Sequence, residues 1–169
     1  MSVPFERGEA GVGWSHGRVG NVLFLTYQTA APEYAVDRSF DLIQRGLARH
    51  PAGVALVGVF GERVPVPTGP ALQKLASQLA QYAPRVVVGS TVVEGESMSA
   101  LVKRAAVAMM TSILKPGYPH KTVRSVALAC DFVASKAVDD TGAPLSQGAL
   151  FMAATAMRAT RLVEPQNGG

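Results

Sequence analysis

The residue types that most often carry chemistry are few in this chain, and they lie far apart. The three histidines are His16, His50 and His120, and the single cysteine is Cys130. No histidine has another histidine, a cysteine or an acid at the spacing of metal ligands, so each is interpreted as a surface or helix-end histidine. Cys130 lies inside an apolar run and is interpreted as a small buried hydrophobic residue. We therefore predict no metal site and no cofactor.

The sequence also lacks the loops that mark common enzyme classes. No Walker A pattern and no G-x-G-x-x-G pattern follows a predicted strand, and Gly11-Val-Gly13 precedes the first strand. The segment Gly89-Ser-Thr lacks the second glycine of a G-x-S-x-G nucleophile elbow, and its serine has no assignable base. Because no nucleophile–base set is visible, we predict no catalytic residue and expect a non-catalytic protein.

Thr68 is the polar residue whose position suggests a function most directly. It follows a loop that contains Pro65 and Pro67, and it stands where a helix is predicted to begin. A hydroxyl at this position can cap the helix, which is the simpler interpretation. A phosphate there would face free backbone amides and the positive end of the helix dipole, so Thr68 is also a candidate phosphorylation site. Its neighbours Arg63 and Gly69 are candidate partner-binding residues.

The densest positive cluster of the chain lies within residues 115–124. It comprises Lys115, His120, Lys121 and Arg124, which we treat as a candidate anion-binding site. The alternative is that Lys115 compensates a helix dipole and that the other residues belong to an exposed strand. One short cluster lacks the stacking platform that nucleic acid needs, and the other basic residues are dispersed, so we predict no nucleic-acid partner.

An alternation of strands and helices is predicted to position these residues. Apolar runs predict a hairpin over 12–27 with its turn at Gly17–Gly20, and strands over 54–60, 85–93 and 120–124. Helical spacing and capping residues predict helices that open at Pro32, contain 72–82, and span 98–114, 125–133 and 144–163. This order predicts the α/β class, with a small mixed, mostly parallel sheet, an N-terminal hairpin and four to five helices.

The domain organisation follows from the same pattern. Residues 1–11 are predicted to be a flexible arm, 12–163 a single domain with an additional C-terminal helix over 144–163, and 164–169 a tail. The predicted core includes Leu23, Leu25, Leu56, Val57, Val87 and Val88.

The helix predicted over 98–114 is apolar on two faces. One stripe contains Met98, Leu101, Val102, Ala105, Met109 and Ile113, and the second contains Ala106, Val107, Met110 and Leu114. A helix on a sheet needs only one apolar stripe, so the other must meet another helix, a partner or a ligand. The final helix is the simplest cover. If a partner covers it, the candidate contact residues are Met98, Val102, Met109 and Met110, and the doubled stripe predicts self-association, most simply a homodimer.

The composition fits one soluble domain. With 169 residues and 48% hydrophobic residues, the chain can bury a core without disulfides, and disorder of the whole chain is excluded. The N-terminus lacks the apolar segment of a signal peptide, and Lys103 and Arg104 interrupt the most apolar helix, so no membrane span is predicted. A lone cysteine fits a reducing compartment, and we expect a cytoplasmic location.

Three segments carry a resemblance to a known family. They are the opening strand Gly20-Asn-Val-Leu-Phe-Leu-Thr-Tyr27, the strand 54–60 before the loop to Thr68-Gly69, and the closing unit His120-Lys-Thr-Val-Arg-Ser-Val-Ala-Leu-Ala-Cys-Asp-Phe-Val-Ala134. Together with the element order, they resemble STAS-like domains, the anti-sigma-factor-antagonist family. The resemblance covers residues 12–137, and the final helix is an addition to it.

The resemblance implies a function that the residues alone do not. Members of this family are typically non-enzymatic, bind kinase-like or anti-sigma-like regulators in bacterial-type signalling, and are in part switched by phosphorylation at the start of the second helix. That position falls on Thr68, although this chain has Pro67-Thr68 where the family often has Asp-Ser. We therefore expect a protein-interaction module. The alternative is a protein that binds a small, lipid-like apolar ligand, and a pocket lined by Met98, Met109 and Phe151 would favour it.

Overall fold

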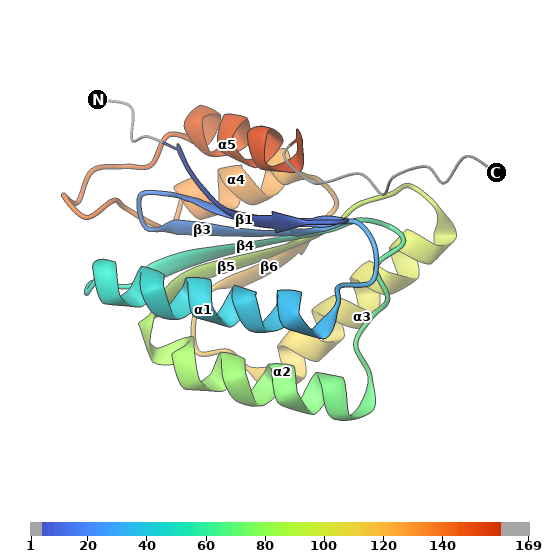
Figure 1. Ribbon diagram of the computed structural model, residues 1–169. Helices are drawn as coiled ribbons and strands as arrows, with labels where there is room; N and C mark the ends of the chain where they lie inside the picture. The colour runs from blue at the N-terminus through green and yellow to red at the C-terminus, as the bar shows by residue number, and fades with distance from the viewer. Residues whose placement is uncertain (1–4, 160–169) are drawn as a thin grey trace.

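The computed structural model describes residues 5–159, without the side chain of Leu114, and it has three layers (Figure 1). The middle layer is a six-stranded sheet whose strand order, β1-β2-β3-β4-β5-β6, follows the chain. The strands are β1 (Phe5–Gly11), β2 (Trp14–Val19), β3 (Val22–Tyr27), β4 (Val54–Phe60), β5 (Val86–Val93) and β6 (His120–Val123). The first three are antiparallel and β3 to β6 are parallel. The predicted fold class is confirmed.

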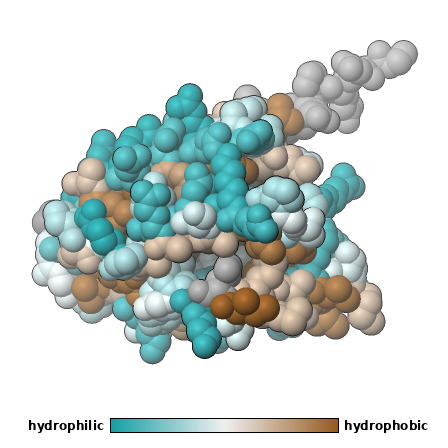
Figure 2. Space-filling view, turned by 90° about the horizontal axis from the view of Figure 1, so that it is seen from below, coloured by the Kyte–Doolittle hydropathy of each residue, from teal (hydrophilic) through white to brown (hydrophobic). Residues whose placement is uncertain are grey.

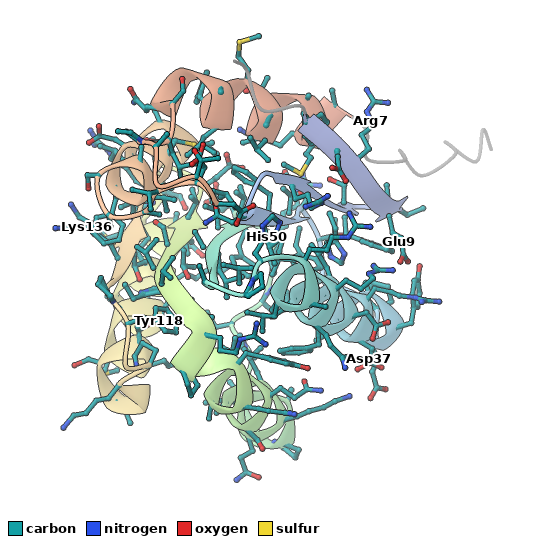
Figure 3. All side chains as sticks on the ribbon, turned by 90° about the vertical axis from the view of Figure 1, so that its left-hand side faces the viewer. Arg7, Glu9, Asp37, His50, Tyr118 and Lys136 are labelled. Carbon is teal, nitrogen blue, oxygen red and sulfur yellow. The ribbon has the colours of Figure 1, made fainter. Side chains whose placement is uncertain are left out.

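Helices cover both faces of the sheet. They are α1 (Glu33–Arg49), α2 (Gly69–Tyr82), α3 (Met98–Leu114), α4 (Val126–Ala134) and α5 (Gln147–Ala159), and a short 3₁₀ turn (Ala83–Arg85) follows α2. Figures 1 and 3 show α4 and α5 on one face and α1, α2 and α3 on the other. Among the described residues, no helix has both the length and the apolar character needed to cross a membrane.

The core is split by the sheet into two clusters, because successive side chains of a strand point to opposite faces. Along β3, Val22 and Phe24 pack under α4 and α5, whereas Leu23 packs under α1. Of the six predicted core residues, four are buried and the two half-buried ones are Leu25 and Val87. Cys130 is buried in the α4 side of the core, as predicted, and burial raises the pKa of its thiol to about 12.

The first strand corrects the prediction of a flexible arm over residues 1–11. Residues 5–11 form β1, which pairs with β2. Its acidic side chains are held by basic ones from other elements: Arg18 of β2 lies 2.6 Å from Glu6, and Arg45 of α1 lies 3.3 Å from Glu9. Residues 1–4 of the predicted arm lie outside the described residues.

The hairpin turn also differs from its predicted place. The reversal occurs at Gly20-Asn21, where Gly20 has a φ of +53°, and Gly17 is a strand residue. A Cβ on Gly17 would lie 2.6 Å from the sulfur of Met157 in α5, so the glycine is needed for helix packing. The final helix is described over Gln147–Ala159, and the predicted end at 163 and the tail lie outside the described residues.

Candidate functional site

A cavity of about 300 Å³ lies between α2, α3 and the sheet. Its floor is formed by β3, β4, β5 and β6, and its walls by the facing sides of the two helices and the loop that follows β4. This volume is at the lower end of the range for small-molecule sites.

Two glycines shape the floor. On β5, a Cβ on Gly89 would lie 2.7 Å from the ring of Tyr118, and on β4 a Cβ on Gly58 would lie 2.8 Å from the ring of Phe60. The missing side chains therefore let two aromatic rings lie close to the sheet. Figure 3 shows Tyr118 beside α3, on the side of the sheet that α2 also covers.

Helix α2 does not close the space. It contains no buried residue, although Leu72, Leu75 and Leu79 recur on one face at helical spacing. These leucines line the cavity and remain half-exposed. Apolar side chains that face an open space leave it ready for an apolar occupant, because filling it removes their surface from water.

Polar groups gather on one side of the cavity, where β5 and β6 meet the end of α3. The Oγ1 atom of Thr91 lies 3.0 Å from Nε2 of His120, and the ring of Tyr118 packs edge-on against His120. Burial lowers the pKa of His120 and raises the pKa of Tyr118, so both side chains are uncharged at neutral pH. The opposite side, formed by β3, β4 and α2, presents mainly aliphatic and aromatic carbon.

The Thr91–His120 contact has the distance of a nucleophile–base pair, but the rest of a catalytic set is not assembled around it. Among the described residues, no group hydrogen-bonds to Nδ1 of His120 and so none orients the imidazole as a base. The arrangement supports binding of a ligand more directly than it supports bond cleavage.

The two charged residues of α3 are turned toward backbone oxygens. The ammonium of Lys103 donates to the carbonyls of Glu62 and Val64, and the guanidinium of Arg104 donates to those of Val93 and Gly95. These bonds tie the helix to the loops at the carboxyl ends of β4 and β5. They also leave the outer face of α3 without a charged side chain.

Comparison of the chain with protein-family models, with curated proteins and with solved structures finds no match in any of the three. The similarity to STAS-like domains therefore stays a prediction from the sequence.

Thr68 lies where the sequence places it, at the entrance to α2. It is the residue that precedes the helix, it is exposed, and the following Gly69 has a φ of +54°. Its hydroxyl makes no capping hydrogen bond, unlike that of Ser97, which accepts from the amide of Ala100 at 3.1 Å. Arg63 is also exposed. The capping interpretation of Thr68 is therefore wrong in detail, and phosphorylation stays a prediction.

The predicted anion-binding cluster is not brought together. His120 points into the cavity, whereas the next residue, Lys121, lies over the ring of Phe132 on the α4 side, 5.8 Å from its centroid. Neighbouring residues of a strand alternate between faces, so the two cannot converge on one anion. Lys115 ends α3 in a left-handed conformation with a φ of +42°, and Arg124 is exposed beyond β6.

The two stripes of α3 have different surroundings. Val107 and Met110 of the second stripe line the cavity, whereas the first stripe faces solvent. The expectation that the final helix covers α3 is wrong, because α5 packs on α4 and β2 across the sheet. Phe151 of α5 therefore does not line the cavity, and Met98 and Met109 do not line it because they lie on the exposed stripe of α3.

One polar cluster was not expected from the sequence. His16, which was interpreted as a surface residue, is buried with its Nε2 3.1 Å from both the Tyr27 hydroxyl and the Ser39 hydroxyl. Tyr27 and Ser39 are also hydrogen-bonded to each other. The sequence did contain a signal for this cluster. Ser39 lies at helical spacing between Val36 and Ile43, so it is a polar residue on the face of α1 that packs on the sheet.

Proposed function

We propose that the protein binds a small apolar ligand in the cavity between α2 and α3. The observation that carries the proposal is the cavity itself, because an apolar space of about 300 Å³ stays open while the leucines of α2 stand beside it half-exposed. The volume lies at the lower end of the range for small-molecule sites and so favours a ligand smaller than a whole phospholipid.

Naphthalene tests this proposal, since it has ten non-hydrogen atoms and no charge. We expect calorimetric titration to give one saturable site per chain. Ala76→Phe, which fills the cavity from α2, should abolish that binding. Ser77→Phe adds the same ring at the next, exposed position and should leave it intact. Absence of naphthalene binding to the wild-type protein, or equal binding by both variants, would contradict the proposal.

A second candidate function is favoured by the outer face of α3. Five large side chains there are 53% to 73% exposed: Met98, Leu101, Val102, Met109 and Ile113. Figure 2 shows these apolar side chains gathered at its lower right. They present on the order of 500 Å² of apolar surface, which is large for a monomer and close to the apolar part of one side of a standard protein interface.

The occupant of this face that we propose is a second copy of the chain, in a homodimer. A face without charges is complementary to itself, whereas a charged partner surface would lose hydration there without gaining an ion pair. The resemblance to STAS-like domains adds that such a homodimer would serve as a protein-interaction module that binds a kinase-like or anti-sigma-like regulator. Thr68, which is exposed beside the loop that lines the cavity, would then be the phosphorylation site of this module.

A further inference from the structure

The polar side of the cavity limits which ligands it can accept. Resting on the proposed function, we infer that the ligand is a small uncharged molecule, apolar except for one oxygen that accepts a hydrogen bond from the Thr91–His120–Tyr118 cluster. A small phenol, ketone, ether or alcohol has this chemistry.

The Thr91–His120 pair always has one hydrogen to offer. If the proton of His120 is on Nε2, that group donates to Thr91, and the threonine hydroxyl hydrogen is free. If the proton is on Nδ1, the threonine donates to Nε2, and the Nδ1 hydrogen is free. In either tautomer, one hydrogen of the pair is not used within the pair.

Tyr118 adds a second donor. Its hydroxyl has no hydrogen-bond partner among the described residues, and its ring borders the cavity beside His120. Two other lining residues carry hydroxyls that are already used: Thr111 donates to the carbonyl of Val107 one turn earlier in α3, and Ser90 donates to the carbonyl of Lys121. The available hydrogens therefore belong to Thr91, His120 and Tyr118, and they favour an oxygen that accepts.

No cation of the cavity lining lies at the Thr91–His120–Tyr118 cluster. Lys103, the cation of the lining, donates to two carbonyl oxygens of the loop that follows β4, and Lys121 lies on the opposite face of the sheet. Lys115 is exposed to solvent in the adjoining depression, which shares Tyr118 and His120 with the cavity, and it is not among the residues that line the cavity. A carboxylate inside the cavity at this cluster would therefore lose its hydration without a cation of the lining beside it, which is costly in an apolar space.

Three probes on one ring system separate the possibilities: naphthalene, 2-naphthol and 2-naphthoate, titrated at pH 7.5. For the wild-type protein we expect 2-naphthol to bind about tenfold more tightly than naphthalene, as one good hydrogen bond allows. We expect 2-naphthoate to bind more weakly than naphthalene. Thr91→Val and Tyr118→Phe should each reduce the advantage of 2-naphthol severalfold and leave the affinity for naphthalene unchanged.

Thr111→Val is the matched control, because its hydroxyl hydrogen is already used within α3 and its loss should not change the order of the probes. Tightest binding of 2-naphthoate, or equal binding of naphthalene and 2-naphthol, would overturn this inference and leave the proposed function standing. Failure of all three probes to bind, with the fold intact by circular dichroism, would overturn both.

Discussion

The buried cluster of His16, Tyr27 and Ser39 couples the stability of the protein to pH. Burial, with a smaller contribution from the charge of Arg45, lowers the pKa of His16 to about 4. The imidazole is thus neutral in the folded protein, whereas in the unfolded chain it takes up a proton near its ordinary pKa of about 6.5. Its stabilising contribution is complete above pH 6.5, decreases as the pH falls from 6.5 to 4, and levels off below 4.

We expect His16 to account for a loss of about 2–3 kcal/mol in the free energy of unfolding between pH 7 and pH 4.5. Urea unfolding at both pH values measures the loss. His16→Gln, which keeps a hydrogen-bonding group that does not titrate, should lose less by about that amount, because acidic residues contribute equally to both proteins. The same loss in both would show that His16 is not the group responsible.

Thr68 gives a second prediction at the residue scale. Because its hydroxyl caps nothing, Thr68→Ala should change the free energy of unfolding by less than about 0.5 kcal/mol. Ser97→Ala removes a hydroxyl that does cap a helix and should cost about 1 kcal/mol in the same urea measurement. A cost for Thr68→Ala as large as that for Ser97→Ala would mean that Thr68 caps α2 in solution.

A negative charge at residue 68 should increase the free energy of unfolding. The first turn of α2 contains no acidic residue, so Thr68→Glu is expected to stabilise the protein by about 0.3–1 kcal/mol through the helix dipole. If Thr68 is a regulatory site, this variant should weaken binding to a partner protein while the fold persists. Equal partner affinity of the wild type, the Ala variant and the Glu variant would end the phosphorylation hypothesis.

Helix α3 has one face that borders the cavity and an opposite, apolar face that is exposed to solvent. We expect light scattering to find a dimer at high micromolar concentration, and the double variant Val102→Lys, Met109→Lys to be monomeric. Because both side chains are more than half exposed, the variant should unfold with nearly unchanged free energy when compared as a monomer.

The control for α3 is Met152→Lys on α5, which is 73% exposed but lies on the other face of the sheet. This variant should remain a dimer. A monomeric wild-type protein, or a dimer that only Met152→Lys disrupts, would show that α3 is not the interface.

At the scale of the whole molecule, most helix starts and the parallel strands were predicted correctly, because signals in the local sequence determine them. The helix starts follow capping residues such as Ser97 and Ser125, which both accept a hydrogen bond from an amide three residues on. The parallel strands follow continuous apolar runs such as 54–60, whose observed boundaries are those predicted. These features depend on neighbours in the chain, so a single sequence is sufficient to find them.

Features that depend on distant residues were not predictable in the same way. Strand β1 is polar and rich in glycine and charge, and its place depends on basic residues of β2 and α1. The lining of the cavity was predicted wrongly because the leucines of α2 have the same spacing whether the helix packs tightly on a sheet or stands away from it. The position of α5 on the sheet was predicted wrongly because an amphipathic pattern shows which face of a helix is buried but not which element covers that face.

The two outermost strands of the sheet are poorly suited to pair with strands of other molecules. β1 carries Glu6, Arg7 and Glu9, and its register with β2 shifts between Arg7 and Ala10. β6, at the other edge, has only four residues, and one of them is Lys121. Charged, bulged or very short edges are poor templates for a strand from another molecule. Within residues 5–159, crowded molecules therefore offer no long, flat edge from which a cross-β fibril could grow.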